Sequence, residues 1–204
     1  MARPQSPDYD QRKQRILDTA AAIFADGGYH KASVSQIARK CDISKALIYH
    51  YFPSKQDILY HALIDYVRLL EETALKRLAA GMGPAETFGD IIRDYLGLYE
   101  SAADRHSLLV GSLEALEPAQ RREVSAVQDR IVKIFGELAD QISPASLDVH
   151  QLRGAVSMLI MGMMNWTYIW FDPTGPVDSA RLAGIIVRML QAGLVALDDE
   201  LLDG

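Results

Sequence analysis

Residues 33–55, SVSQIARKCDISKALIYHYFPSK, decide how this chain folds at its N-terminal end. They contain two short segments of helical periodicity, 34–40 and 45–51, with a break of about three residues between them. A serine precedes each segment, at Ser33 and at Ser44, and serine is a preferred residue at a helix N-cap. The stretch therefore predicts two short helices that are joined by a tight turn.

Longer helices are predicted on both sides of this pair. From Asp8 onward, apolar residues recur at the spacing of one buried helical face, and Gly27-Gly28 ends that helix. Pro53 ends the segment 45–51, because a residue before proline is disfavoured in a helix. Ser54 is then the N-cap of a long helix that runs to about Ala80.

The remainder of the chain is also predicted to be helical. It shows no alternating strand pattern and no internal repeat, and proline-rich or glycine-rich breaks separate its apolar segments. The fold class is therefore all-α with about nine helices. The predicted domains are an N-terminal domain at 1–53 and a larger C-terminal domain at 54–204, which the helix 54–80 connects. The further predicted helices are Ala85–Ala103, Arg105–Ala115, Ala119–Ile142, Asp148–Phe171 and Asp178–Leu197.

Three helices over residues 8–51 match a helix-turn-helix unit, whose last helix can enter the DNA major groove. Helices of about seven residues cannot bury enough surface alone, so the first long helix must pack over them. The inner face is predicted to consist of Ile37, Ala38, Ile43, Ile48 and Phe52. The side chains left outside on the third helix, which suit a groove surface, are Lys45, Ala46, Tyr49 and His50.

Phosphate groups bind well at helix N-termini, where unpaired N–H groups and the helix dipole favour an anion. Ser33, Ser44 and Ser54 stand at three such termini, and Lys55 follows directly. Each serine alone is an ordinary cap, but the whole array favours a DNA-binding surface.

The charge distribution agrees with a polyanion bound at one end. The whole chain carries a formal net charge of −6, yet residues 1–60 hold 9 basic and 6 acidic side chains.

The single cysteine, Cys41, excludes an internal disulfide framework and fits a reducing compartment. The first fifteen residues lack the apolar core of a secretory signal, so a cytoplasmic location is expected.

The segment at 32–59, ASVSQIARKCDISKALIYHYFPSKQDIL, closely resembles the DNA-binding signature of the TetR family of bacterial transcriptional regulators. The similarity covers about residues 10–65. It implies an all-helical homodimer with an N-terminal DNA-binding domain and a C-terminal ligand-binding and dimerisation domain. By position, the resemblance places Lys45, Ala46 and Tyr49 nearest the bases. The residues that it implies as contacts to operator phosphates are Ser33, Arg39, Ser44, Lys45, Tyr49, His50 and Lys55.

Two residues depart from the family pattern. Asp42 stands in the turn where the family usually has glycine, and aspartate tolerates the left-handed conformation better than most residues. Ala46 stands where glycine is frequent, which affects the operator sequence more than the fold.

The last predicted helix has an apolar seam that favours self-association through a four-helix bundle. Burial of this seam within one chain is the alternative, and the family resemblance favours the dimer. The candidate dimer residues are Leu182, Ile186, Met189, Leu190, Gly193, Leu194 and Leu197.

Soft and aromatic side chains gather on the preceding helix, at 158–170, and such groups are typical of apolar ligand pockets. A plain core or dimer seam is the alternative for most of them. The stretch NWTYIWFDPTGP resembles TetR-family repressors that respond to acyl-CoA thioesters, which implies a CoA thioester effector. The candidate effector-binding residues are Phe88, Ile92, Arg93, Tyr95, Tyr99, Arg121, Arg122, Met161, Asn165, Trp166, Tyr168 and Trp170.

Other readings are less consistent with the sequence. Gly154–Phe171 is 18 residues without a charge, which is borderline for a membrane span, but a buried central helix fits its polar residues better. Neither a zinc-ligand pattern nor a nucleophile elbow occurs, so we expect no enzyme, no metal site and no cofactor. The sequence predicts a ligand-responsive, homodimeric DNA-binding regulator, most simply a repressor. A DNA-binding protein without a small-molecule effector is the alternative.

Overall fold

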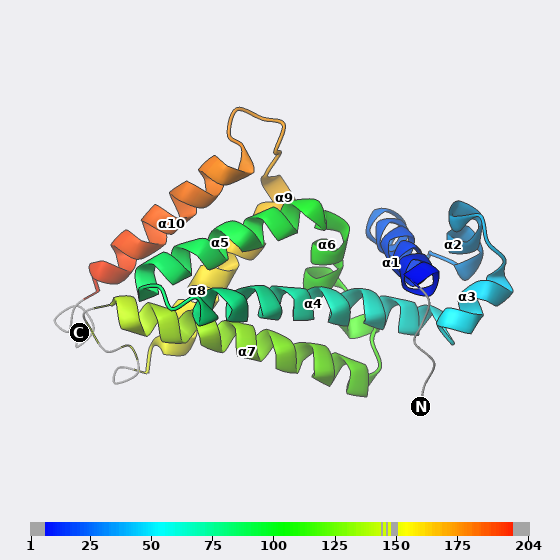
Figure 1. The fold of residues 1–204 in the computed structure, drawn as a ribbon, viewed down its shortest axis with the longest axis horizontal. Helices are drawn as coiled ribbons and strands as arrows, with labels where there is room; N and C mark the ends of the chain where they lie inside the picture. The colour runs from blue at the N-terminus through cyan, green and yellow to red at the C-terminus, as the bar shows by residue number, and fades with distance from the viewer. Residues whose placement is uncertain (1–6, 144, 146, 148–150, 198–204) are drawn as a thin grey trace. The chain divides into compact units, whose positions relative to one another are not determined.

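The computed structural model of the protein describes residues 7–143, 145, 147 and 151–197, and within them it is helical without a strand. This confirms the predicted all-α fold (Figure 1). The elements are α1 (Pro7–Gly27), α2 (Val34–Cys41), α3 (Lys45–Tyr51), α4 (Lys55–Ala79), α5 (Pro84–Ser101), α6 (Ala103–Gly111), the 3-10 helix η1 (Leu113–Ala115), α7 (Pro118–Ile142), α8 (Arg153–Asn165), α9 (Thr167–Trp170) and α10 (Ser179–Val195).

Most helix boundaries lie close to their predicted positions, and two predicted helices are interrupted. The helix predicted at 105–115 ends at Gly111, and the 3-10 turn η1 follows it. The helix predicted at 148–171 begins at Arg153 and is broken at Trp166, which leaves α9 as a single turn. The start of that prediction, at 148–150, lies outside the described residues. Within the described residues, nine α-helices remain when α9 and the 3-10 turn η1 are set aside, as predicted.

The chain forms two compact units, each with its own core. The first comprises Met1–Val67 and Asp104–Val124, and the second comprises Arg68–Ala103 and Ser125–Gly204. The long helices α4 and α7 each contribute residues to both units. The predicted boundary between residues 53 and 54 separates two functional domains, whereas the two compact units are defined by contacts. The predicted boundary stays a prediction.

In the first unit, α1 packs against α2, and α2 packs against α3. Ile16 and Phe24 of α1, Ile37 of α2, and Ile48 and Phe52 at α3 are almost completely buried. Burial of each such side chain contributes about 1.5–3 kcal/mol, and most of this burial is possible only when the three helices are together. Of the predicted inner face, Ile43 alone remains partly exposed.

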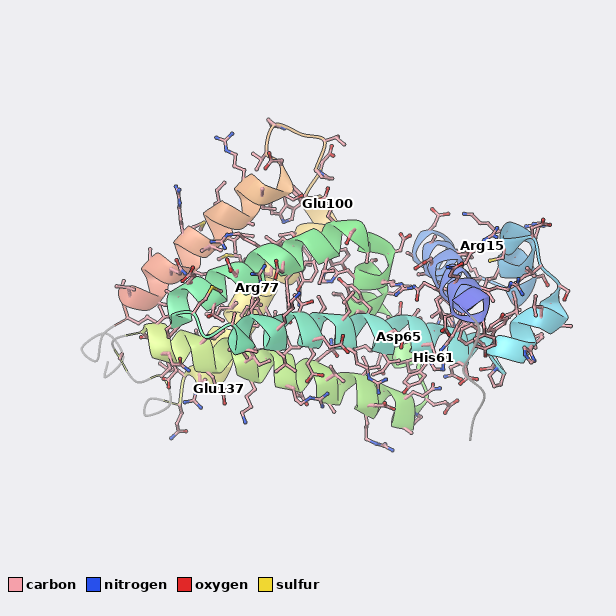
Figure 2. The ribbon with its side chains drawn as sticks, viewed as in Figure 1. Arg15, His61, Asp65, Arg77, Glu100 and Glu137 are labelled. Atoms are coloured by element: carbon pink, nitrogen blue, oxygen red, sulfur yellow. The ribbon has the colours of Figure 1, made fainter. Side chains whose placement is uncertain are left out.

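In the second unit, α10 lies along α5, and α8 contacts α10 (Figure 1). The close contact between α7 and α8 requires a small residue at Gly136, since a Cβ atom there would lie 2.6 Å from Ser157 Oγ. Arg77 of α4, which is labelled in Figure 2, donates to Asp94 of α5 at 2.6 Å and to Asp90 at 3.2 Å. These bonds tie the two helices together.

The uncharged segment Gly154–Phe171 is divided between two short helices. Among the described residues, no helix combines the length and the apolar character that a bilayer-spanning segment requires.

Candidate nucleic-acid interface

Helix α2 begins with a complete capping box. The Gln36 N–H donates to Ser33 Oγ at 3.3 Å, and the Ser33 N–H donates to Gln36 Oε1 at 2.8 Å. These bonds satisfy two of the backbone donors that a helix start leaves unpaired, so α2 begins at a defined residue. Ser33 and Gln36 are exposed, and the N-terminus of α2 therefore faces outward.

The turn between α2 and α3 depends on one residue with left-handed backbone geometry. Asp42 has φ 55° and ψ 47°, and its N–H donates to the carbonyls of Ala38 and Arg39. The following Ile43 N–H bonds the Ala38 carbonyl at 3.0 Å. The expectation that aspartate would hold this turn in place of glycine is confirmed. The turn sets the angle between the two short helices.

Helix α3 presents four neighbouring side chains to the outside. Ser44 caps it by accepting the Leu47 N–H at 3.1 Å, and Ile48 is buried beneath it. The exposed side chains are those predicted for the outer face, namely Lys45, Ala46, Tyr49 and His50. Tyr49 is 48% exposed, which leaves its ring accessible for stacking and its hydroxyl accessible for hydrogen bonding.

Aromatic contacts join the end of α3 to the beginning of α1. The rings of Tyr9 and Tyr51 lie 4.5 Å apart, and His50 packs edge-on against Tyr51. Lys13 Nζ lies 5.9 Å from the centre of the Phe52 ring. Helix α1 thus supports α3 at its C-terminal end as well as from the core.

Lys55, predicted to contact a phosphate, is bonded within the protein. Its Nζ donates to the carbonyl oxygens of Tyr29 at 2.9 Å and Ala32 at 3.0 Å, and it lies 4.3 Å from the centre of the Tyr29 ring. Burial, and to a smaller extent the negative charge of Asp57, raises the pKa of Tyr29 above its ordinary value. The sequence did not indicate these partners, because they lie 23 and 26 residues away along the chain.

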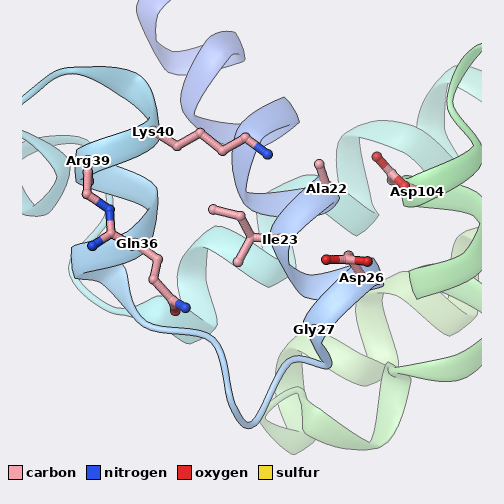
Figure 3. Close-up of a pocket in the computed structure, with 8 residues that line it drawn as sticks. All are labelled: Ala22, Ile23, Asp26, Gly27, Gln36, Arg39, Lys40 and Asp104. Carbon is pink, nitrogen blue, oxygen red and sulfur yellow. The ribbon is translucent and has the colours of Figure 1, made fainter.

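A hollow of about 560 Å³ lies between α1, α2 and α6 in the first unit (Figure 3). Arg39 and Lys40 of α2 form its basic side, and Asp26 and Asp104 contribute carboxylates. The two acids offset the two bases, so the hollow is not a basic patch. Arg39, a predicted phosphate contact, is exposed at this hollow.

Several candidate effector residues meet in the core of the second unit. Phe88 and Tyr95 of α5 pack on Phe135 of α7, with ring centres 5.9 and 5.6 Å apart, and Tyr95 donates to the Leu70 carbonyl at 2.8 Å. Tyr99 donates to Asn165 Oδ1 at 2.8 Å. Ile92 and Met161 are buried as well. Phe135 was not predicted, although its position among the buried residues of α7 could have indicated it.

Other candidate effector residues lie elsewhere. Trp166 and Trp170 are exposed by 62% and 57%, and Tyr168 is half-buried. Arg93 is exposed and pairs with Asp90 of its own helix. The remaining two belong to the first unit: Arg121, which pairs with Glu114, and Arg122, which is exposed.

The predicted dimer seam on α10 divides between two faces. Leu182, Ile186 and Leu194 are buried within the chain, whereas Leu190 and Leu197 are half-buried. Met189 and Gly193 are exposed, and Ile185 and Val195, which were not predicted, are exposed beside them. The exposed large apolar residues of α8, of α9 and of the junction between them are Met158, Leu159, Met163, Trp166, Ile169 and Trp170.

The head, which we define as α1–α3 with the first turn of α4, is a helix-turn-helix unit of the DNA-binding type. Residues 16–62 match the sequence profile described as "Bacterial regulatory proteins, tetR family". Residues 81–194, more than half of the chain, match the profile "Tetracyclin repressor-like, C-terminal domain". The chain therefore belongs to the TetR family of transcriptional regulators, whose C-terminal domain responds to ligands.

Solved structures of this family have the same fold. A TetR-family transcriptional regulator from Bordetella parapertussis 12822 is 33% identical, with a TM-score of 0.83 over 87% of this chain and 93% of that one. AibR, in a complex with isovaleryl coenzyme A and operator DNA, is 25% identical, with a TM-score of 0.76 over 87% of this chain and 97% of its own.

Similar characterised proteins are transcriptional regulators too. The repressor KstR of Mycobacterium tuberculosis is 24% identical, and the match covers 88% of this chain and 80% of KstR. The regulator HbdR of Aromatoleum sp. is 27% identical, and the match covers 55% of this chain and 49% of HbdR. The chain thus spans about half the length of this relative.

The left-handed turn residue yields a prediction on stability. Replacing Asp42 by glycine removes the steric cost of a Cβ at positive φ, so Asp42→Gly should raise the free energy of unfolding by ~0.5–1 kcal/mol. Asp42→Val should lower it by ~1–2 kcal/mol, since a β-branched residue adopts this conformation poorly. Urea unfolding measures both variants, and Asp26→Gly, which replaces an exposed helical aspartate, is the control. Equal stability of the wild type, Asp42→Gly and Asp42→Val would mean that the turn is not left-handed.

Proposed function

We propose that this protein is a homodimeric repressor that binds a palindromic operator and leaves it when a hydrophobic effector, a CoA thioester, binds. The observation that carries the proposal is the exposed row Lys45, Ala46, Tyr49 and His50 on a short helix whose Ile48 is buried in the core. A helix held in this way can insert into the major groove without losing its core contacts.

The chemistry of the head suits both phosphates and bases. The capped N-termini of α2 and α3 offer backbone N–H groups and a positive dipole end to phosphate oxygens, and Arg39 and Lys45 add charge. On the groove side, Ala46 can contact a thymine methyl group, and Tyr49 and His50 can bond to base edges or phosphates. The Ser33 and Ser44 hydroxyls contribute to the phosphate contacts in this proposal.

Self-association is supported by the exposed apolar side chains of α8, α9 and α10. Apolar residues of this size that stay exposed on contacting helices are typical of an interface. The proposed dimer face therefore centres on Met189 and Gly193 of the predicted seam, together with Ile185 and Val195 of α10 and the exposed residues of α8. Two such helices from each chain would form a four-helix bundle. Two heads would then reach successive major grooves of a palindrome.

The effector half of the proposal is supported by the family and by one neighbour. AibR was solved with isovaleryl coenzyme A and operator DNA, and its fold matches this chain over most of the length. The apolar and aromatic side chains around Phe88, Tyr95 and Met161 would hold an acyl chain, and Tyr99 and Asn165 offer polar groups near it. Arg93, Arg121 and Arg122 are the cations proposed for the phosphates of CoA.

An effector that shifts operator occupancy from 99:1 to 1:99 must prefer the released form by about 5.5 kcal/mol. A large acyl chain can supply this difference, since each buried methylene contributes about 0.8 kcal/mol.

The alternative function is that the C-terminal domain serves dimerisation only and binds no effector. The complete burial of Phe88, Ile92 and Tyr95 favours it, because these residues already pack on their neighbours.

The recognition helix is tested by substitutions on α3. Lys45→Met and Tyr49→Ala should each weaken binding to a duplex selected by the wild type from a random library by ~1–3 kcal/mol. Fluorescence anisotropy measures the affinity, and circular dichroism checks that the fold is retained. Lys76→Met, which removes an exposed lysine at the end of α4, should bind like the wild type. Unchanged affinity in both α3 variants would place the recognition surface elsewhere.

The dimer face is tested by a charge on α10. Met189 is 59% exposed, so Met189→Glu should leave the chain folded but convert the dimer to a monomer, because an unpaired carboxylate in an apolar interface costs several kcal/mol. Sedimentation equilibrium measures the mass. Leu75→Glu is the control, since Leu75 is 49% exposed on α4. A Met189→Glu protein with the mass of a dimer would refute this interface.

The effector class is tested with isovaleryl-CoA, a long-chain acyl-CoA, free CoA and the free acid. A thioester at 100 times its Kd should stabilise the protein by about 2.7 kcal/mol in a thermal-shift assay and release the operator. Arg93→Ala should weaken this response while operator binding without effector is unchanged. A panel in which no thioester stabilises the protein or frees DNA removes the effector claim and leaves the DNA-binding claim intact.

A further inference from the structure

Lys55 differs from Lys45 and Arg39 in what its side chain contacts. Lys45 and Arg39 are exposed, whereas Lys55 is half-buried and its ammonium bonds two main-chain carbonyls, those of Tyr29 and Ala32. The Tyr29 ring lies against the same ammonium, with its centre 4.3 Å from Nζ. Two hydrogen bonds and one cation–π contact hold the charge in one place.

The two carbonyls belong to the loop that connects α1 and α2. Gly28 begins this loop with φ 80°, and the N–H groups of Lys31 and Ala32 both bond the Gly28 carbonyl at 3.2 Å. Both bonds lie at the long end of the normal N–H···O range and share one acceptor, and the Lys55 ammonium adds two further bonds to the same loop. Ala32 is followed directly by Ser33, the N-cap of α2. The contact with Lys55 therefore fixes the position from which α2 starts.

We propose that Lys55 is a positioning residue for DNA binding. Its ammonium ties the α1–α2 loop to the start of α4, and this holds Ser33 and the N-terminus of α2 in the place where a phosphate binds. Lys55 does not itself neutralise a phosphate. This proposal rests on the proposed DNA-binding function, and it changes the role that the family resemblance gives to this lysine.

The energetics favour this role over a direct contact. If the ammonium turned to a DNA phosphate, the half-buried ammonium would leave the Tyr29 and Ala32 carbonyls and the Tyr29 ring. Carbonyls that lose a charged donor lose a strong hydrogen bond. The N-terminus of α2 needs no lysine to bind an anion, because its N–H groups and dipole already do so. A fixed loop makes this preformed site available without an ordering cost on binding.

Salt dependence separates a positioning lysine from a phosphate-binding one. The logarithm of the binding constant falls linearly with the logarithm of the salt concentration. Each phosphate that a cation neutralises contributes about −0.9 to the slope. A dimer that loses one direct contact in each chain should therefore show a slope shallower by about 1.8. The experiment compares wild type, Lys55→Met, Lys55→Arg and Lys45→Met on a duplex selected by the wild type, over a series of KCl concentrations. Hydrogen exchange of the amides at 29–36 is measured on the same free proteins.

For Lys55→Met we expect affinity about tenfold lower with an unchanged salt slope, and faster exchange at 29–36. Slow exchange at Ile37 and Ile48 should persist, which shows that the head stays folded. Lys55→Arg should restore most of the affinity, since a guanidinium can still donate to both carbonyls. Lys45→Met should show the shallower slope.

Two results would overturn the proposal: a slope for Lys55→Met as shallow as that for Lys45→Met, or exchange at 29–36 that matches the wild type. A wild-type protein that selects no duplex would instead refute the proposed function. The exchange measurement would still decide whether Lys55 holds the loop.

Discussion

The functional surface depends on burial that three helices share. Helices α2 and α3 have eight and seven residues, too few to be stable alone in water. They form because Ile37, Ile48 and Phe52 are buried together with Ile16 and Phe24 of α1. This packing determines which side of α3 remains outside. The outward direction of Tyr49 and Lys45 is thus a consequence of the core.

Capping adds precision to this packing. The capping box at Ser33, the left-handed Asp42 and the Ser44 cap fix where each short helix begins or ends. A shift of one residue would rotate the exposed row by about 100° around the helix axis. Each cap contributes about 1 kcal/mol, which is modest for stability but decisive for the register of the groove surface. The contact of Lys55 with the α1–α2 loop acts in the same way on the start of α2.

The second unit has an interior of aromatic side chains and an exterior that keeps large apolar residues exposed. Phe88, Tyr95 and Phe135 pack edge to face, while Trp166 and Met189 remain in contact with solvent. The exposed exterior supports the proposed joining of two chains. In the proposed regulation the second unit also accepts a ligand, and for this its interior aromatic side chains, which already pack on one another, would have to move apart. In the proposed mechanism, effector binding in one domain of a dimer would favour a state in which the two heads no longer match a palindrome.

The sequence by itself determined the two short helices and their caps, because these depend on residues within four positions of one another. Its apolar pattern also indicated which side chains of α3 stay outside, and packing against α1 realises that pattern. It predicted segment 45–51 as the helix that the structure contains, and Asp42 as a left-handed turn. Tertiary structure decided the features that depend on distant partners. It placed Leu182 and Ile186 inside the chain and Met189 outside, and it joined Lys55 to carbonyls more than twenty residues away. The apolar stripe of α10 is wide enough for two partners, so only packing against α5 determines which part of it stays exposed.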